Sequence, residues 1–137
     1  MKNKQILITC GVCLIPTIFG VIIYNHLPAQ LPIHWNLSGQ IDNYGSKAIV
    51  VFGLPILMCL IQGFMMFMLF NDPKHRNHSF KMINVVSWII PVITIILEAI
   101  TYAVALGYHI SINFVMPLLI GVIFIILGNY LPKCRQN

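Results

Sequence analysis

Long apolar blocks separated by short polar segments set the pattern of this chain. Four blocks cover residues 6–25, 47–70, 82–106 and 113–131, and each is long enough to cross a hydrocarbon layer of about 30 Å as a helix. Only 8% of the residues are charged and 58% are hydrophobic, whereas roughly a quarter of a soluble domain is charged. The pattern predicts an all-α membrane protein that forms a single membrane domain, residues 1–137, with four transmembrane helices.

Basic residues lie almost entirely on one side of the predicted helices. Of the eight Lys and Arg residues, seven flank the blocks at the two termini and in the loop at 71–81, and the exception is Lys47. Because cytoplasmic loops carry the excess of Lys and Arg, we expect both termini and the basic loop to be cytoplasmic and residues 27–46 to face outward. The net charge of +5 therefore reports orientation in the lipid bilayer, and we expect no direct binding of nucleic acid.

The outward segment at 27–46 has a pattern of its own. Leu31, Ile33, Trp35 and Leu37 alternate with polar residues or proline, and this period of two predicts one half-buried face of an extended strand. A turn at 37–40 would lead to a second short strand. We therefore expect an ordered extracellular cap, formed as a short β-hairpin, with Ser46 as the N-cap of the second helix.

Each apolar block also contains one proline, at positions 16, 55, 91 and 117. A proline inside a helix frees a backbone carbonyl, which neighbouring helices or Ser and Thr hydroxyls satisfy in membrane proteins. The prolines therefore predict kinked helices. A further proline, Pro132, is expected to end the fourth helix.

Glu98 is the only ionisable residue deep inside a predicted helix. It shares one helical face with other polar residues and a proline, so we expect this face to point into the bundle, where Thr94, Thr101 or Tyr102 can hydrogen-bond the carboxyl group. The residues of the face are Ser87, Pro91, Thr94, Glu98, Thr101 and Tyr102.

Two interpretations of Glu98 stay open. One is a site for a ligand, an ion or a proton beneath the outer cap, since intramembrane carboxylates are commonly functional. Its candidate cationic partners are Lys47, His26, His34 and His109. The other is a structural carboxyl group, neutralised by burial, that ties helices together.

No pattern in the chain predicts catalysis. A nucleophile elbow, a P-loop, a dinucleotide-binding fingerprint and paired carboxylates are all missing from the sequence. His34 with Asp42, or His75 with His78, lack the third and fourth ligands that a metal site requires. We therefore expect no enzyme, no cofactor and no metal.

Two motifs carry a resemblance to a known family. Residues 32–47 read P-I-H-W-N-L-S-G-Q-I-D-N-Y-G-S-K, and residues 127–133 read L-G-N-Y-L-P-K. In both places the chain resembles bacterial multi-pass immunity proteins, similar to the one that protects sporulating Bacillus-type cells from their own sporulation-delaying peptide toxin. In that family the second motif leads into further segments, whereas this sequence stops at Asn137. We therefore expect a natural short form, a fragment or a truncated product.

The resemblance implies immunity to a membrane-active peptide toxin, recognised at the outer cap. The residues that would carry the recognition are His34, Trp35, Asn36, Gly39, Asp42, Lys47 and Glu98. One alternative, also implied by the family, is a membrane receptor that sequesters a cytoplasmic transcriptional repressor, for which the 71–81 loop offers a docking surface. Another is a small ion-coupled transporter that uses Glu98.

Overall fold

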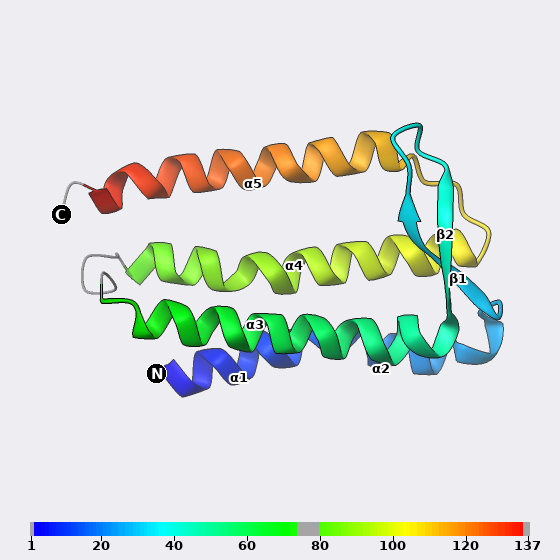
Figure 1. Cartoon of the computed structure of the whole chain (residues 1–137), viewed down its shortest axis with the longest axis horizontal. Coiled ribbons are helices and arrows are strands. Elements are labelled where there is room, and N and C mark those ends of the chain that lie inside the picture. The colour runs from blue at the N-terminus through cyan, green and yellow to red at the C-terminus, as the bar shows by residue number, and fades with distance from the viewer. Residues whose placement is uncertain (1, 74–79, 136–137) are drawn as a thin grey trace.

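A computed structural model describes residues 2–73 and 80–135 of the chain. Within these ranges four helices are long and apolar enough to cross a membrane, and a two-stranded antiparallel hairpin lies between the first and second. The prediction of an all-α, multi-pass membrane protein with a short hairpin is confirmed. The elements (Figure 1) are α1 (Lys2–Cys13), α2 (Ile15–Ile22), the 3₁₀ helix η1 (Tyr24–His26), β1 (Gln30–Trp35), β2 (Ile41–Ser46), the π-helix η2 (Ile49–Gly53), α3 (Leu54–Asn71), α4 (Phe80–Ala105) and α5 (Ile112–Arg135).

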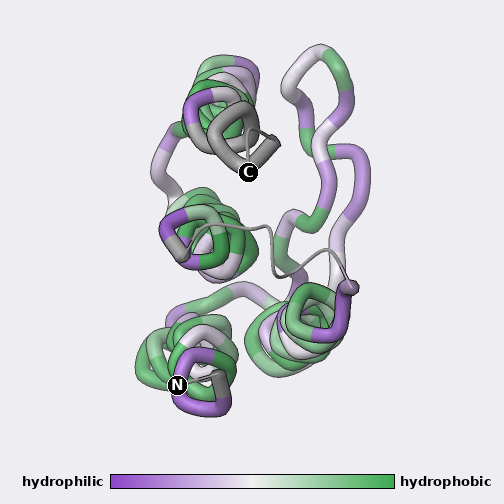
Figure 2. Tube along the Cα trace, turned by 90° about the vertical axis from the view of Figure 1, so that its left-hand side faces the viewer, coloured by the Kyte–Doolittle hydropathy of each residue, from purple (hydrophilic) through white to green (hydrophobic). Residues whose placement is uncertain are grey.

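The hairpin closes one end of the bundle, while the start of α1 and the end of α5 lie at the other end (Figure 1). Seen along the bundle, α1–α2, α3 and α4 pack together and α5 lies on the far side of α4 (Figure 2). The hairpin crosses from the α3 side towards α5. Most of the basic loop at 71–81, including His75 and His78, falls outside the described residues.

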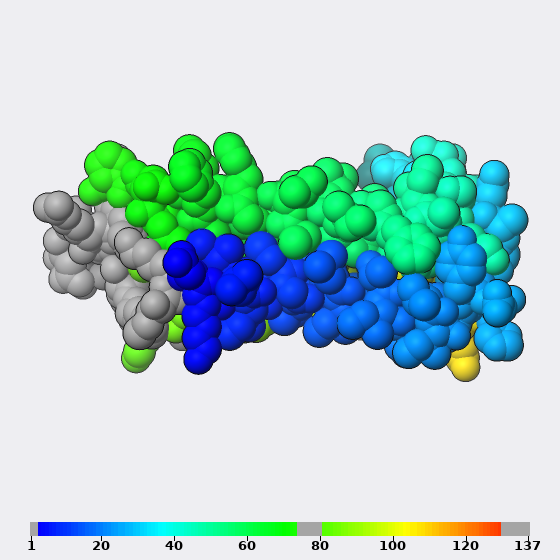
Figure 3. Space-filling model, turned by 90° about the horizontal axis from the view of Figure 1, so that it is seen from below, coloured from blue at the N-terminus to red at the C-terminus, as the bar shows by residue number. Residues whose placement is uncertain are grey.

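The helices α1, α2 and α3 form one long face of the molecule, where they lie side by side (Figure 3). Large apolar side chains on these helices are exposed, among them Leu7, Ile18, Leu60 and Phe64. A water-soluble protein of this size rarely exposes so large a continuous apolar surface. In a membrane protein such a surface faces lipid, which agrees with the four long apolar helices.

Prolines interrupt the helices, and side chains from neighbouring helices satisfy two of the carbonyls that they free. The first helix breaks at Leu14, two residues before Pro16. Pro55 has no N–H for the carbonyl of Val51, and the hydroxyl of Thr17 on α2 donates to that oxygen over 2.8 Å. Pro91 leaves the carbonyl of Ser87 in the same position, and Nε2 of Gln62 on α3 donates to it over 2.8 Å. These bonds cross between helices, so the prolines fix how the helices pack.

The last helix differs from its prediction at its end. We expected Pro132 to close it, but α5 continues to Arg135. A proline removes one hydrogen bond and crowds one turn without forcing a helix to stop. The expectation that Pro132 ends the helix was therefore wrong.

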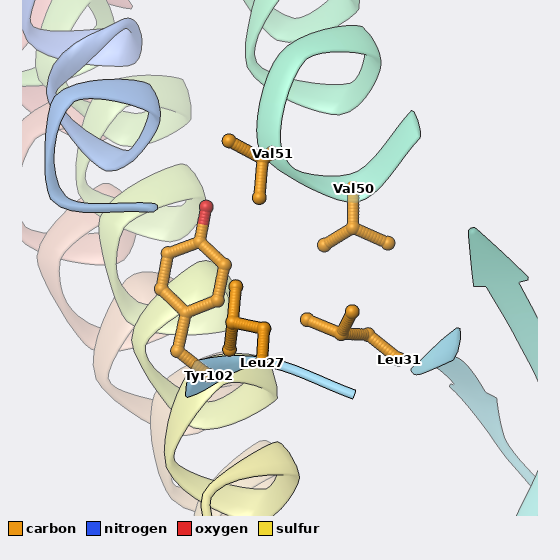
Figure 4. Close-up of a cluster of buried hydrophobic side chains, with 5 residues drawn as sticks. All are labelled: Leu27, Leu31, Val50, Val51 and Tyr102. Carbon is orange, nitrogen blue, oxygen red and sulfur yellow. The ribbon is translucent and has the colours of Figure 1, made fainter. Parts of the chain in front are cut away.

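The base of the hairpin is fixed to the helices by a buried cluster (Figure 4). Leu27 and Leu31 meet the side chains of Val50, Val51 and Tyr102, and all five are at most 5% exposed. The chain then enters the second membrane helix at Ser46, whose Oγ accepts the backbone N–H of Ile49 over 3.3 Å. This confirms Ser46 as the predicted cap.

The predicted apolar face of the first strand was wrong in detail. Leu31 is fully buried, but Ile33 is 39% exposed and Leu37, which lies in the turn, is fully exposed. The register shifts on both sides of His34, which leaves Ile33 without a partner on β2. Such a bulge reverses which face the following residues occupy, so the simple alternation ends after Leu31.

Candidate functional site

The hairpin roofs a cavity of about 720 Å³ that extends between the helices. Its walls come from β1, the hairpin turn, α3, α4 and α5, so segments that are far apart in the sequence build it. The lining residues are Ile33, His34, Trp35, Asn36, Leu37, Leu54, Met58, Thr94, Leu97, Glu98, Thr101, Ile112, Asn113, Met116 and Pro117. Most of them are apolar, and neither lysine nor arginine is among them.

Glu98 on α4 is the acidic residue of this cavity. The side chains of its predicted polar face are all buried, from Ser87 at 0% exposed to Thr101 at 7%, which confirms that the face points into the bundle. Glu98 itself is 5% exposed, and its Oε2 has no hydrogen-bond partner within the described residues. The carboxyl group therefore belongs to the cavity that the hairpin roofs, and one of its oxygens is unsatisfied.

Two of the expected partners of Glu98 direct their hydroxyl protons elsewhere. Thr94 donates to the carbonyl of Ile90 in its own helix over 2.7 Å. Tyr102 donates to the carbonyl of Pro16 over 3.0 Å, which joins α4 to α2. Tyr102 also lies within hydrogen-bonding reach of the Glu98 carboxyl group, but Oε2 of that group has no partner within the described residues.

His34 faces the cavity from the roof and is braced from the second strand. Its Nδ1 lies 2.6 Å from Oδ1 of Asp42. Asp42 does not line the cavity, so its contribution is to orient the imidazole ring. The pair joins the two strands at the bulge, where the regular ladder of backbone bonds is interrupted.

Asn36 organises the tip of the hairpin. Its Oδ1 accepts the backbone N–H groups of Ser38 and Gln40, both over 2.9 Å, as in the turns that asparagine side chains stabilise. Gly39 follows with a φ of +81°, and a Cβ atom there would lie 2.7 Å from Nδ2 of Asn113. The tip therefore requires glycine, both for its backbone conformation and for its close approach to α5.

Lys47 does not take part in the cavity. Its Nζ donates to the carbonyl of Tyr24 over 3.2 Å and lies 4.4 Å from the centre of the Tyr24 ring. The lysine thereby ties the start of the second membrane helix to the end of the first. His26 and His109, also expected as partners of Glu98, are not among the lining residues.

The structure thus sorts the predicted residues into two groups. His34, Trp35, Asn36 and Glu98 line one cavity, whereas Gly39, Asp42 and Lys47 shape or anchor the hairpin around it. The sequence interpretation missed the opposite wall, which Met58, Asn113 and Met116 supply. The sequence did contain an indication that Asn113 belongs to this site, because it is a polar residue in the first turn of a helix that starts on the hairpin side.

Comparison with known proteins agrees with the motifs. Residues 11–59 match a family described as a domain of unknown function, DUF1648. Over 135 residues, 98% of this chain, the sequence is 28% identical to the Immunity protein SdpI of Bacillus subtilis strain 168. The chain spans 63% of the length of that relative. No solved structure matches the chain.

Neither match names a transcriptional repressor or a transported ion, so the receptor and transporter alternatives gain no support. The DUF1648 match includes all of the hairpin, and the second match extends over almost the entire sequence. Together they confirm the resemblance predicted from the motifs: this chain is similar to the Immunity protein SdpI over almost its entire length, and the part that includes the hairpin matches DUF1648.

Proposed function

We propose that this chain is a non-enzymatic immunity protein of the bacterial cell membrane. It would protect the cell from a membrane-active peptide toxin by holding part of the peptide in the cavity beneath the hairpin. The observation that carries the proposal is the position of the motif at 32–47. This segment forms the roof of a cavity that Glu98 also lines. Among the described lining residues Glu98 is the acidic one, and it is buried.

The size and lining of the cavity suit a segment of a peptide. About 720 Å³ falls within the ~300–1,000 Å³ that is usual for small-ligand pockets, so a few side chains fit and a folded toxin does not. Apolar walls with a few polar groups are typical of sites that orient an apolar ligand. The similarity to Immunity protein SdpI supports a peptide toxin as that ligand.

A challenge experiment tests this function directly. A sensitive bacterial strain expresses the chain and receives the purified sporulation-delaying peptide toxin, and survival is counted. We expect the wild-type chain to protect, and Trp35→Ala and Glu98→Gln to reduce protection at equal protein levels in the membrane. Trp88→Ala is the matched control, because Trp88 is partly exposed on the apolar surface of α4 and does not line the cavity. Absence of protection by the wild-type chain refutes the proposal.

The proposal requires the hairpin to face outward, as the distribution of Lys and Arg predicts. Gln40 lies at the exposed hairpin tip, and Lys4 is exposed near the opposite end. In a variant without native cysteines, Gln40→Cys should react in intact cells with a maleimide that cannot cross the membrane. Lys4→Cys should react only after lysis, and the reverse result means that the hairpin faces the cytoplasm.

A further inference from the structure

The unsatisfied oxygen of Glu98 indicates what kind of ligand group the cavity takes. Only 5% of the surface of Glu98 is exposed, and its Oε2 meets no hydrogen-bond donor in the described part of the chain. Removing a carboxylate from water costs several kcal/mol unless an opposite charge or hydrogen bonds compensate. A donor brought by the occupant of the cavity would supply what the protein itself does not.

The other lining groups leave this role to the occupant. Among the residues that the structure describes, no lysine or arginine lines the cavity, and Lys47 is held on the carbonyl and ring of Tyr24. His34, the one basic residue of the lining, is paired with Asp42. Nothing in the lining therefore competes with a ligand cation for the carboxyl group of Glu98.

The walls argue against a bare metal ion and favour an organic cation. Calcium takes six to eight oxygen ligands, and magnesium requires near-octahedral oxygen coordination. Most of the side chains that line the cavity are apolar, including Met58, Leu97, Ile112 and Met116, and among the described residues no group of three His, Cys, Asp or Glu side chains could hold a metal ion. The apolar side chains suit an alkyl chain. The indole ring of Trp35, in the roof of the same cavity, also attracts cations to its face.

We infer that the cavity binds a primary ammonium group carried on an apolar chain, with the ammonium at Oε2 of Glu98 and the chain between α3, α4 and α5. In the cell this group would be an amino group of the peptide toxin. That assignment rests on the proposed function, whereas the preference of the cavity for an alkylammonium does not.

Binding of decylamine to the purified full chain tests the inference. The sequence has two tryptophans, so Trp88→Phe leaves Trp35 as the single fluorescent reporter within the cavity. The protein is placed in nanodiscs of phosphatidylcholine and phosphatidylglycerol, which contain no primary amine, and is titrated with decylamine or decanol. We expect saturable binding that is at least about tenfold tighter for the amine, as a charge-assisted hydrogen bond implies.

Glu98→Gln keeps the shape of the side chain and removes its charge, and it also controls for partition of the probes into lipid. It should abolish the preference for decylamine and leave the affinity for decanol unchanged. Equal affinity of the wild-type chain for the two probes overturns the inference, and this comparison does not depend on whether the variant folds. An unchanged preference in Glu98→Gln overturns it as well.

Further experiments identify the source of the ammonium group and distinguish failure of this inference from failure of the proposed function. If phosphatidylethanolamine in the nanodiscs abolishes decylamine binding, the lipid headgroup is the occupant, and the assignment to the peptide is overturned. Protection in the toxin challenge without any preference for the amine refutes the inference alone. A preference for the amine without protection refutes the proposed function alone.

Discussion

Thr17→Val should destabilise the helix bundle, because the Thr17 hydroxyl satisfies a carbonyl that a proline in another helix has freed. In a regular α-helix the N–H of residue 55 would donate to the carbonyl of Val51, but residue 55 is proline and has no N–H. The turn before it is the π-helix η2, where the N–H of Leu54 donates to the carbonyl of Ile49, five residues back. Thr17 donates to the carbonyl oxygen of Val51 instead, over 2.8 Å. Valine has the shape of threonine without the hydroxyl, so the substitution removes the donor and creates no cavity.

The magnitude follows from where the carbonyl lies. Val51 is fully buried, so water does not replace the lost donor. An unsatisfied buried acceptor costs about 1–3 kcal/mol, whereas interhelical hydrogen bonds in membrane proteins average about 0.6 and reach about 1.7 kcal/mol. We expect Thr17→Val to lower the free energy of unfolding by about 1–2 kcal/mol.

Restoring the backbone donor should remove this cost. In Pro55→Ala the turn can tighten from π-helical to α-helical geometry, which brings the N–H of residue 55 to the carbonyl of Val51. Thr17→Val in that background should then cost less than about 0.5 kcal/mol, the usual error of additivity. The assay is unfolding by SDS in mixed micelles, followed by circular dichroism, for the wild type, the two single variants and the double variant. An equal cost of Thr17→Val in both backgrounds refutes the reasoning.

Thr9→Val is the matched control. Thr9 is also a fully buried threonine of the first membrane helix, but its hydroxyl donates to the carbonyls of Gln5 and Ile6 within that helix. Backbone N–H groups already reach those carbonyls in a regular helix. The control should therefore change the free energy of unfolding by no more than about 0.5 kcal/mol.

Three further predictions use the same unfolding assay. Gly20→Ala should destabilise the protein by about 1–3 kcal/mol, because the new Cβ would lie 2.5 Å from the hydroxyl of Tyr102; an unchanged midpoint would contradict this close packing. Leu31→Ala should cost about 2–5 kcal/mol and Leu37→Ala close to nothing, since the first is fully buried and the second fully exposed; similar costs would contradict the bulged register. Gly39→Ala should cost about 1–2 kcal/mol and increase proteolysis at the hairpin tip, since residue 39 has a positive φ; an unaffected tip would argue against this turn.

The sequence predicted most of the helical architecture, because the signals involved are local. A transmembrane helix is visible as a long apolar block, and the buried face of α4 follows from the 3.6-residue repeat that joins Ser87, Glu98 and Tyr102. The cap at Ser46 is equally local, since a serine side chain reaches only the first turn of its own helix. These features depend on residues within a few positions of one another.

The parts that the sequence did not predict depend on contacts between distant segments. The bulge at Ile33 arises from pairing with the second strand, so the alternation from Leu31 to Leu37 alone could not reveal it. Thr17 meets Val51 only because two helices pack side by side. The cavity is harder still to predict from the sequence, since its lining residues Met58 and Asn113 come from different helices and line one cavity only once the bundle has formed.

Lys47 contacts Tyr24 and not Glu98, so the residue that anchors the hairpin can be tested separately from the residues of the proposed binding site. From the sequence Lys47 was a candidate to neutralise Glu98, but its ammonium contacts Tyr24 instead. Lys47→Ala should therefore cost about 0.5–1 kcal/mol of stability, the value of an exposed cation–π contact, and leave the preference for decylamine over decanol unchanged. Glu98→Gln should instead abolish that preference. If Lys47→Ala instead strengthens decylamine binding several-fold, Lys47 compensates the charge of Glu98 in the wild-type chain. That result would contradict the inference that a ligand supplies the cation.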